Sequence, residues 1–336
     1  MSRSAIFLLI LLLSVSMGGN ALPQPTSDAA PLDFDTFQLL RADGTAVAPV
    51  TVDQAADALK DYDVVVIGEL HDHIANHLAE LALLRAIHAR APRIALSMEM
   101  FERDQQPTVD DYLAGKIGES TLTGALSWRN YDEAYRPLVE FAKDRRLAVI
   151  AANAPGKIVR CVGREGISYL SKLQKEKRDQ VAAEIHSGEG AYKQKFMGFL
   201  NSNAAHGGSK DAQDLADKSF AAQVTRDDTM AESIAKFLAG NPEYKVLHIT
   251  GTFHAEERLG TIERLSLRAP DLQIALVLPL PTESGATLAA SDLKGADYGI
   301  RIRKAPEPYA TDKEKKDAEA RETARFREAA KSSCAG

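Results

Sequence analysis

The chain has 336 residues, a length that fits one large α/β domain with an insertion or two small domains. Its 47 acidic residues outnumber its 41 basic residues, and the formal net charge of -6 argues against a protein that binds the nucleic-acid backbone. The sequence contains no CxxC motif, so it offers no thiolate zinc site.

Residues 1–21 are typical of a secretory signal peptide. Arg3 supplies positive charge, residues 5–15 form a short apolar core, and small residues at 19–21 suit a signal peptidase. No lipobox cysteine lies near this segment. We expect cleavage after Ala21 and an exported, periplasmic protein, with an uncleaved membrane anchor as the alternative.

An unbroken apolar run rich in valine, and four further runs that are largely apolar, predict buried strands of a parallel sheet. These runs lie at 64–67, 93–99, 147–152, 246–250 and 273–278, and residues 298–303 are expected to form an edge strand. The fold class is therefore α/β, with a largely parallel central sheet flanked by helices. The expected parts are a linker and N-terminal segment (22–50), the α/β core (51–156 and 245–305), a helical insertion that caps the strand carboxyl ends (157–244), and a charged tail (306–336).

Several helices follow from apolar periodicity. One stripe, formed by Ile74, Leu78, Leu81, Leu84 and Ile87, predicts a helix directly after the first strand. His73 and His77, one turn apart, could bind a metal ion together, although solvated histidines are commoner on helices. Within the insertion, residues 167–185 and 219–238 are expected to be helical.

Polar side chains follow two of the predicted strands at matching positions. Gly68 and Gly251 each end a strand, and His71 and His254 each stand three residues later. Because ligands bind at the carboxyl ends of strands in open α/β sheets, these two G-x-x-H turns can present both imidazoles to one crevice.

Two glutamates, Glu69 and Glu99, also lie at strand ends. With the two histidines they could hold a divalent metal ion, or act as a metal-free acid/base group, or be satisfied structural groups. The sequence has no H-E-x-x-H motif and no G-x-S-x-G nucleophile elbow.

The insertion adds polar groups to an inward helix face. Gln223 and Asp227 lie on the stripe of the 219–238 helix, with Arg226 beside them, and such groups need partners or a site. Cys161 and Cys334 could pair in an oxidising compartment; an unpaired or intermolecular thiol is the alternative.

Without a CxxCH motif, haem would need a non-covalent axial ligand and apolar surface around it. From their residue types, the side chains that could supply these are Tyr131, Tyr135, Tyr192, Phe196, Met197, Phe199 and His206. Residues of these types lie in a hydrophobic core more often than at a haem site.

Six ordered motifs resemble the ChaN-like family of bacterial haem-binding, iron-uptake-associated proteins, within the Tiki/TraB/erythromycin-esterase-like superfamily. They are V-V-V-I-G-E-L-H-D at 64–72, M-E-M-F-E-R-D-Q-Q at 98–106, W-R-N-Y-D-E-A-Y-R-P-L-V-E-F-A at 128–142, A-A-N-A-P at 151–155, A-Q-V-T-R-D-D-T-M-A at 222–231 and I-T-G-T-F-H at 249–254. The resemblance implies a sheet with a helical insertion and haem held non-covalently at a homodimer interface, ligated by tyrosine with histidine assistance. Tyr131, Tyr135 and His206 are the candidate ligands.

The resemblance makes an exported haem-binding protein of haem or iron uptake the leading expectation. Its partners would be haem, a second copy of the chain, and a haem-uptake receptor or transport components, with no nucleic acid. The wider superfamily includes hydrolases, so the alternative is an ester or peptide hydrolase, with or without a metal ion. In that case Glu69, His71, Glu99 and His254 would be catalytic.

Overall fold

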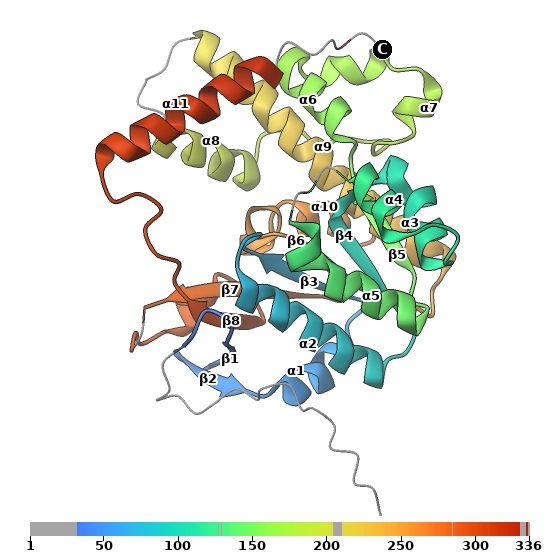
Figure 1. The fold of residues 1–336 in the computed structure, drawn as a ribbon, viewed down its shortest axis with the longest axis vertical. Coiled ribbons are helices and arrows are strands. Elements are labelled where there is room, and N and C mark those ends of the chain that lie inside the picture. The colour runs from blue at the N-terminus through green and yellow to red at the C-terminus, as the bar shows by residue number, and fades with distance from the viewer. Residues whose placement is uncertain are drawn as a thin grey trace, which may run out of the picture.

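The computed structural model describes residues 32–126, 128, 130–203, 210–283, 285–329 and 334. The predicted signal peptide and His206 lie outside these residues. The fold is built on an eight-stranded sheet with the order β2-β1-β8-β7-β3-β6-β4-β5 (Figure 1). Its strands are β1 (Phe37–Asp43), β2 (Ala46–Val50), β3 (Val64–Glu69), β4 (Ile94–Glu102), β5 (Val149–Asn153), β6 (Lys245–Gly251), β7 (Ile274–Thr282) and β8 (Tyr298–Arg303).

The sheet is largely parallel, as predicted. Strands β3 to β8 pair in parallel, and the β1–β2 hairpin adds two antiparallel strands beside β8. The prediction of an edge strand at 298–303 was wrong, because residues 37–40 of β1 pair with β8 and cover it. The N-terminal hairpin carries too little apolar periodicity to show this in the sequence.

Helices cover both faces of the sheet. On β3, Val65 and Ile67 pack on the side of α1 (Val52–Leu59), α2 (Ile74–Arg90) and α5 (Arg136–Arg145), near the shorter α3 (Gln106–Leu113) and α4 (Glu119–Ala125). Val64 and Val66 point to the other side, against the end of α9 (Lys210–Gly240) and α10 (Thr261–Arg268). Burial on both faces explains the unbroken apolar run of this strand.

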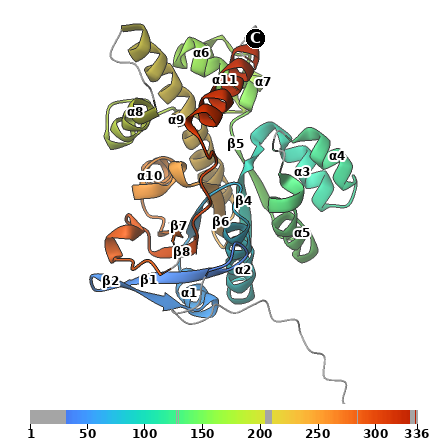
Figure 2. The same cartoon turned by 60° about the vertical axis from the view of Figure 1, so that its left-hand side comes forward.

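The insertion forms a helical lobe over the carboxyl ends of the strands (Figures 1 and 2). It contains α6 (Gly156–Glu165), α7 (Lys175–Arg178), α8 (Ala191–Asn203) and the first half of α9, and its described residues include no strand. The prediction of one helix over 167–185 was wrong, since only a 3₁₀ segment at 167–172 and α7 form there. Arg178 donates to the carbonyl groups of Val181, Ala182 and Ala183 and so holds the following segment in a non-helical path.

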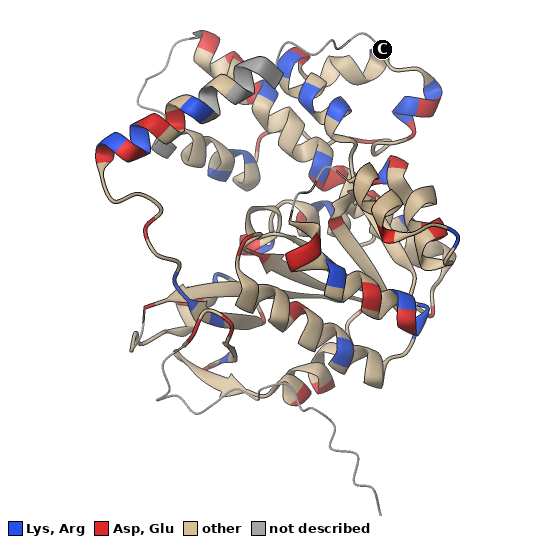
Figure 3. Ribbon diagram, in the orientation of Figure 1, with Lys and Arg blue, Asp and Glu red and all other residues tan. Residues whose placement is uncertain are grey.

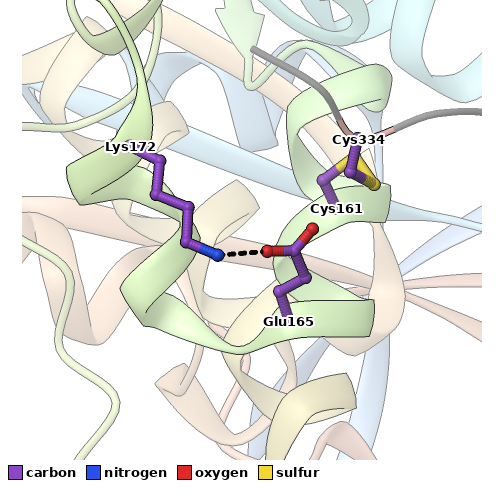
Figure 4. The surroundings of a disulfide bond; sticks show 4 residues. All are labelled: Cys161, Glu165, Lys172 and Cys334. Carbon is purple, nitrogen blue, oxygen red and sulfur yellow. Dashed lines mark hydrogen bonds and ion pairs between the residues drawn. A yellow bond between two sulfur atoms is a disulfide. The ribbon is translucent and has the colours of Figure 1, made fainter.

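A charged C-terminal helix, α11 (Asp312–Ala329), follows β8 and lies on the side of the insertion (Figures 1 and 2). Acidic and basic side chains alternate along it (Figure 3). Cys334 forms a disulfide with Cys161 of α6, with Cα atoms 5.6 Å apart, next to the Glu165–Lys172 ion pair (Figure 4). Of the two alternatives for these cysteines, the structure shows the pair. No helix within the described ranges is long and apolar enough to cross a membrane.

The disulfide predicts how the tail responds to reduction. Because α11 is exposed and highly charged, it has little packing of its own to hold it in place. We therefore expect reduction or Cys334→Ser to free the tail from α6 and to speed trypsin cleavage after Lys313, Lys315 and Lys316. Limited trypsin digestion followed by mass spectrometry measures this, with the oxidised wild-type chain as control. Equal cleavage of both forms would contradict a tethering role for the disulfide.

Candidate functional site

A cavity of about 710 Å³ lies at the carboxyl ends of β3 and β6, beneath the insertion. Ligand pockets of proteins commonly fall in this size range. The end of β3 and the turn after it contribute acidic and imidazole side chains, and the turn after β6 contributes the second imidazole. The lining includes Glu69, His71, His73, Phe196, Phe199, Gln223, Gly251, Phe253 and His254.

The first G-x-x-H turn holds His71 by a buried carboxylate. Glu69 is 2% exposed, and its Oε1 lies 2.5 Å from His71 Nδ1 and accepts a hydrogen bond from the Tyr135 hydroxyl at 2.6 Å. Burial alone raises the pKa of Glu69, but the hydrogen bond with His71 and the nearby imidazoles of His71 and His77 outweigh it and lower the pKa to about 2.

His71 is fixed with its second nitrogen beside Gly251. Burial favours the neutral ring, but the hydrogen bond with Glu69 and the charge of Glu99 outweigh it and raise the pKa of His71. A Cβ atom placed on Gly251 would lie 2.9 Å from His71 Nε2, so the glycine leaves the space that this nitrogen occupies. Trp128 packs on the same imidazole, with ring centroids 4.7 Å apart. Glu69, Gly251 and Trp128 together fix the orientation of the His71 ring.

The second turn holds His254 between two other carboxylates. Its Nδ1 lies 2.8 Å from Asp227 Oδ1, and its Nε2 lies 3.5 Å from Glu99 Oε1. Glu99 in turn accepts hydrogen bonds at Oε2 from the Thr250 hydroxyl and the Gly251 backbone N–H, both at 2.7 Å. Burial alone raises the pKa of Glu99, but the nearby imidazoles and these donors lower it overall. His254 shows the reverse balance, since Asp227 and Glu99 raise its pKa against burial.

The polar side chains on the inward face of α9 have the partners that the sequence predicted they would need. Asp227 is fully buried and accepts hydrogen bonds from the hydroxyls of Tyr192 and Thr261, at 2.8 and 2.9 Å. The Gln223 amide donates to the Tyr192 hydroxyl at 3.0 Å and lines the cavity. Arg226 is not among the lining residues, but its positive charge lowers the pKa of His254 in part.

The tyrosines considered as haem ligands lie away from the cavity wall. Tyr135 is fully buried and donates its hydroxyl to Glu69, and burial is the main cause that raises its pKa. Tyr131 is 3% exposed, and its hydroxyl has no hydrogen-bond partner among the described residues. Neither tyrosine lines the cavity. His206 lies outside the described residues.

The predicted stripe of α2 was right at Leu81, Leu84 and Ile87, which are buried, and wrong at its N-terminal end. Ile74 is 52% exposed, whereas His77 and Glu80 are buried on the inward face. His73 and His77 are both buried, and their imidazoles contact different groups. His73 Nε2 lies 2.8 Å from the Arg303 carbonyl oxygen, whereas His77 Nε2 donates to the His71 carbonyl group at 3.0 Å. The signal that could have identified this face is Glu80, an acid three residues after His77 within an otherwise apolar helix.

The structure brings together a different donor set from the one predicted for a metal ion. Among the described residues, the group with donor atoms within 4.8 Å of one another is Glu69, His77 and Glu80. The predicted set of Glu69, His71, Glu99 and His254 shares one cavity region but does not form such a group. Its arrangement is instead two imidazoles, each held at Nδ1 by a carboxylate.

Fold and site together define an α/β protein whose helical insertion covers a cavity with two carboxylate-held histidines. The chain belongs to the family described as "Haem-binding uptake, Tiki superfamily, ChaN", whose model matches residues 55–265. No curated protein sequence matches it significantly.

A solved structure shows the same fold. The chain is similar to ChaN of Campylobacter jejuni, in a structure described as cofacial haem binding, with 18% identity, a TM-score of 0.60, and coverage of 80% of this chain and 97% of the other. It is more distantly similar to the erythromycin esterase EreC (11% identity, TM-score 0.45, coverage 77% and 95%) and to the type III effector HopBA1 (11%, 0.44, coverage 83% and 100%).

The raised pKa of His254 gives a prediction with a defined sign. The folded pKa lies above the ordinary value of 6.5, so the stabilisation from the Asp227–His254 pair is fully present below pH 6.5 and is lost as the pH rises through the folded pKa. We expect Asp227→Asn to lower the pKa of His254 and Arg226→Gln to raise it. Histidine NMR titration measures both shifts, and two shifts of the same sign would contradict this electrostatic account.

Proposed function

We propose that this protein is an exported haem-binding protein that serves haem or iron uptake. The observation that carries the proposal is His71, an imidazole held at Nδ1 by Glu69 with its Nε2 beside Gly251 at the wall of a large cavity. Membership of a haem-binding uptake family supports it.

The cavity wall suits a flat apolar macrocycle. Phe253 lies at its centre, with ring centroids 6.1 Å from Phe196 and 5.3 Å from Phe199. Phe199 is 52% exposed, which leaves apolar surface at the cavity mouth for a ligand to cover. These aromatic side chains come from α8 of the insertion and from the turn after β6.

The residues present also fit the ligand requirement of haem iron. A histidine that donates its other ring N–H to a carboxylate has a fixed orientation and a more basic second nitrogen. Glu69 does this for His71, so His71 would hold the iron and the aromatic wall would pack against the ring. When bound, haem would supply a single redox-active iron at this wall. The structure thus favours His71 over Tyr131 and Tyr135 as the axial ligand.

The assembly and the cellular setting belong to the same proposal. Cofacial haem groups lie face to face, and an arrangement of that kind in this chain would join two copies at their open cavities. We therefore propose a homodimer in the haem-bound form, an exported and periplasmic location, and transfer to or from haem-uptake receptor or transport components. The exposed Phe199 at the cavity mouth supports a contact of this type.

Haemin titration tests the ligand assignment. We expect a shifted Soret band on adding haemin to the wild-type chain, and loss of that shift in His71→Ala because the iron loses its nitrogen ligand. Tyr131→Phe and Tyr135→Phe should keep it. Affinity should rise with pH through the raised pKa of His71, since only the neutral ring can ligate iron.

His88→Ala is the matched histidine control, because His88 lies near the end of α2, packs on Phe141 and does not line the cavity. Its titration curve should equal that of the wild type. Loss of the Soret shift in Tyr131→Phe with retention in His71→Ala would transfer the ligand role to the tyrosine. No spectral change with the wild-type chain would end the haem proposal.

A second candidate function, hydrolysis of an ester or peptide bond, is favoured by one specific observation. His254 has Nδ1 on Asp227 and Nε2 toward Glu99, the arrangement that orients an imidazole for general acid/base catalysis. His71 and Glu69 repeat the pattern across the same cavity. In this reading one imidazole would activate water, and a protonated partner would stabilise the developing charge.

The hydrolase candidate predicts turnover that depends on both histidines. His254→Asn should lower kcat/KM by roughly 10²–10⁴-fold, the usual contribution of a positioned general acid or base. A panel of activated esters and peptides measures this, with His88→Ala as the control. Absence of turnover in the wild-type chain across the panel would count against this function and leave haem binding unaffected.

A further inference from the structure

Three buried side chains behind the cavity converge on one point. Glu69 and Glu80 are 2% and 0% exposed, and His77 is 8% exposed. His77 Nδ1 lies 3.1 Å from Glu80 Oε2 and 3.4 Å from Glu69 Oε2. All three donor atoms lie within 4.8 Å of one another.

Each of the three residues is fixed by its other polar atom. Glu69 Oε1 is bound by His71 and Tyr135, and His77 Nε2 donates to the His71 carbonyl group. Glu80 Oε1 accepts a hydrogen bond from Asn76 at 2.9 Å. The remaining atom of each residue therefore points at the common centre, where His77 Nδ1 and Glu80 Oε2 form a hydrogen bond at 3.1 Å. A preformed ligand set is oriented in this way.

One of these atoms has no hydrogen-bond partner. Glu69 Oε2 is buried and makes no hydrogen bond within the described part of the chain, and its neighbour His77 Nδ1 is at the long distance of 3.4 Å. A buried carboxylate oxygen without a donor is costly. Its direction, into the gap shared with His77 and Glu80, indicates a missing cation.

The local charge count agrees. Glu69 pairs with His71 and His77, Glu80 pairs with His77, and neither carboxylate has an ion pair with Lys or Arg among the described residues. Burial and the charge of Glu69 raise the pKa of Glu80 to about 8, because the two carboxylates repel each other. Buried charges need partners or metal coordination. Cations that bind through one imidazole and two carboxylates are first-row divalent ions such as Zn²⁺.

We propose that Glu69, His77 and Glu80 form a buried site for a first-row divalent cation, separate from the two histidines that face the cavity. Bonds of about 2.0–2.2 Å in a tetrahedral site place neighbouring ligand atoms roughly 3.3–3.6 Å apart. The two measured separations, 3.1 and 3.4 Å, are close to that spacing. Because Glu69 also lines the cavity, the ion can enter from that side, and a water molecule can complete the coordination.

Zinc binding to the full chain tests the proposal. The wild-type chain, stripped with a chelator and titrated with Zn²⁺ alone, should bind one equivalent. Glu80→Gln should weaken binding by at least about tenfold, while Glu133→Gln, the same change at an exposed position on the π-helical segment before α5, should not. His254→Asn, which removes a donor facing the cavity, should also retain the zinc. Calorimetry gives the affinity and elemental analysis gives the stoichiometry.

Several outcomes would overturn the proposal: no zinc bound by the wild-type chain, unchanged affinity in Glu80→Gln, or loss of zinc in His254→Asn. Since Glu80→Gln could fail to fold, X-ray absorption of the zinc-loaded wild-type chain gives an independent reading. One imidazole with oxygen neighbours supports the site, whereas two imidazoles would place the ion at His71 and His254. None of these measurements depends on haem binding.

Discussion

The structure depends on one buried carboxylate, that of Glu69 at the end of β3. A carboxylate at 2% exposure in the interior is tolerated only where donors surround it. Hydrogen bonds reach Glu69 from the turn that follows the strand and from the segment before α5, and the imidazole of His77 on α2 faces it at 3.4 Å. The last of these, Tyr131–Tyr135, is a π-helix, a rare form often found at functional sites, and its final residue places the Tyr135 hydroxyl on Glu69. The local path of the chain around β3 follows from this requirement.

The same carboxylate divides the site into two compartments. One oxygen of Glu69 orients His71 at the cavity, and the other faces His77 and Glu80 behind the wall. The second half of the cavity has carboxylates of its own, since His254 lies between Asp227 of the insertion and Glu99 of β4. Glu99 links the two halves, because its charge also raises the pKa of His71.

The parallel sheet and the paired turns were predictable because their signals are local. An apolar strand followed by glycine and histidine occurs twice, and the register that pairs Glu69 with Gly251 brings the two turns together. The buried face of the first turns of α2 was not predictable from apolar residues alone. It carries Asn76, His77 and Glu80, polar residues that bond to one another and to the turn after β3. The partner of Tyr135 was not predictable either, since only the fold brings its hydroxyl to Glu69.

The pairing of β3 with β6 also has a consequence for when the site comes into existence. The Thr252 hydroxyl bonds to the backbone of Glu69 across 183 residues of sequence, with the whole insertion between them. A growing chain that has emerged only as far as α9 has Glu69 and His71 but lacks Gly251, Phe253 and His254. The cavity wall is thus completed late in synthesis, since chains emerge from the N-terminus first and such long-range pairing forms slowly. A nascent chain that ends before β6 holds only half of the pocket, so the pocket is complete only once β6 and the turn after it have been made and have paired with β3.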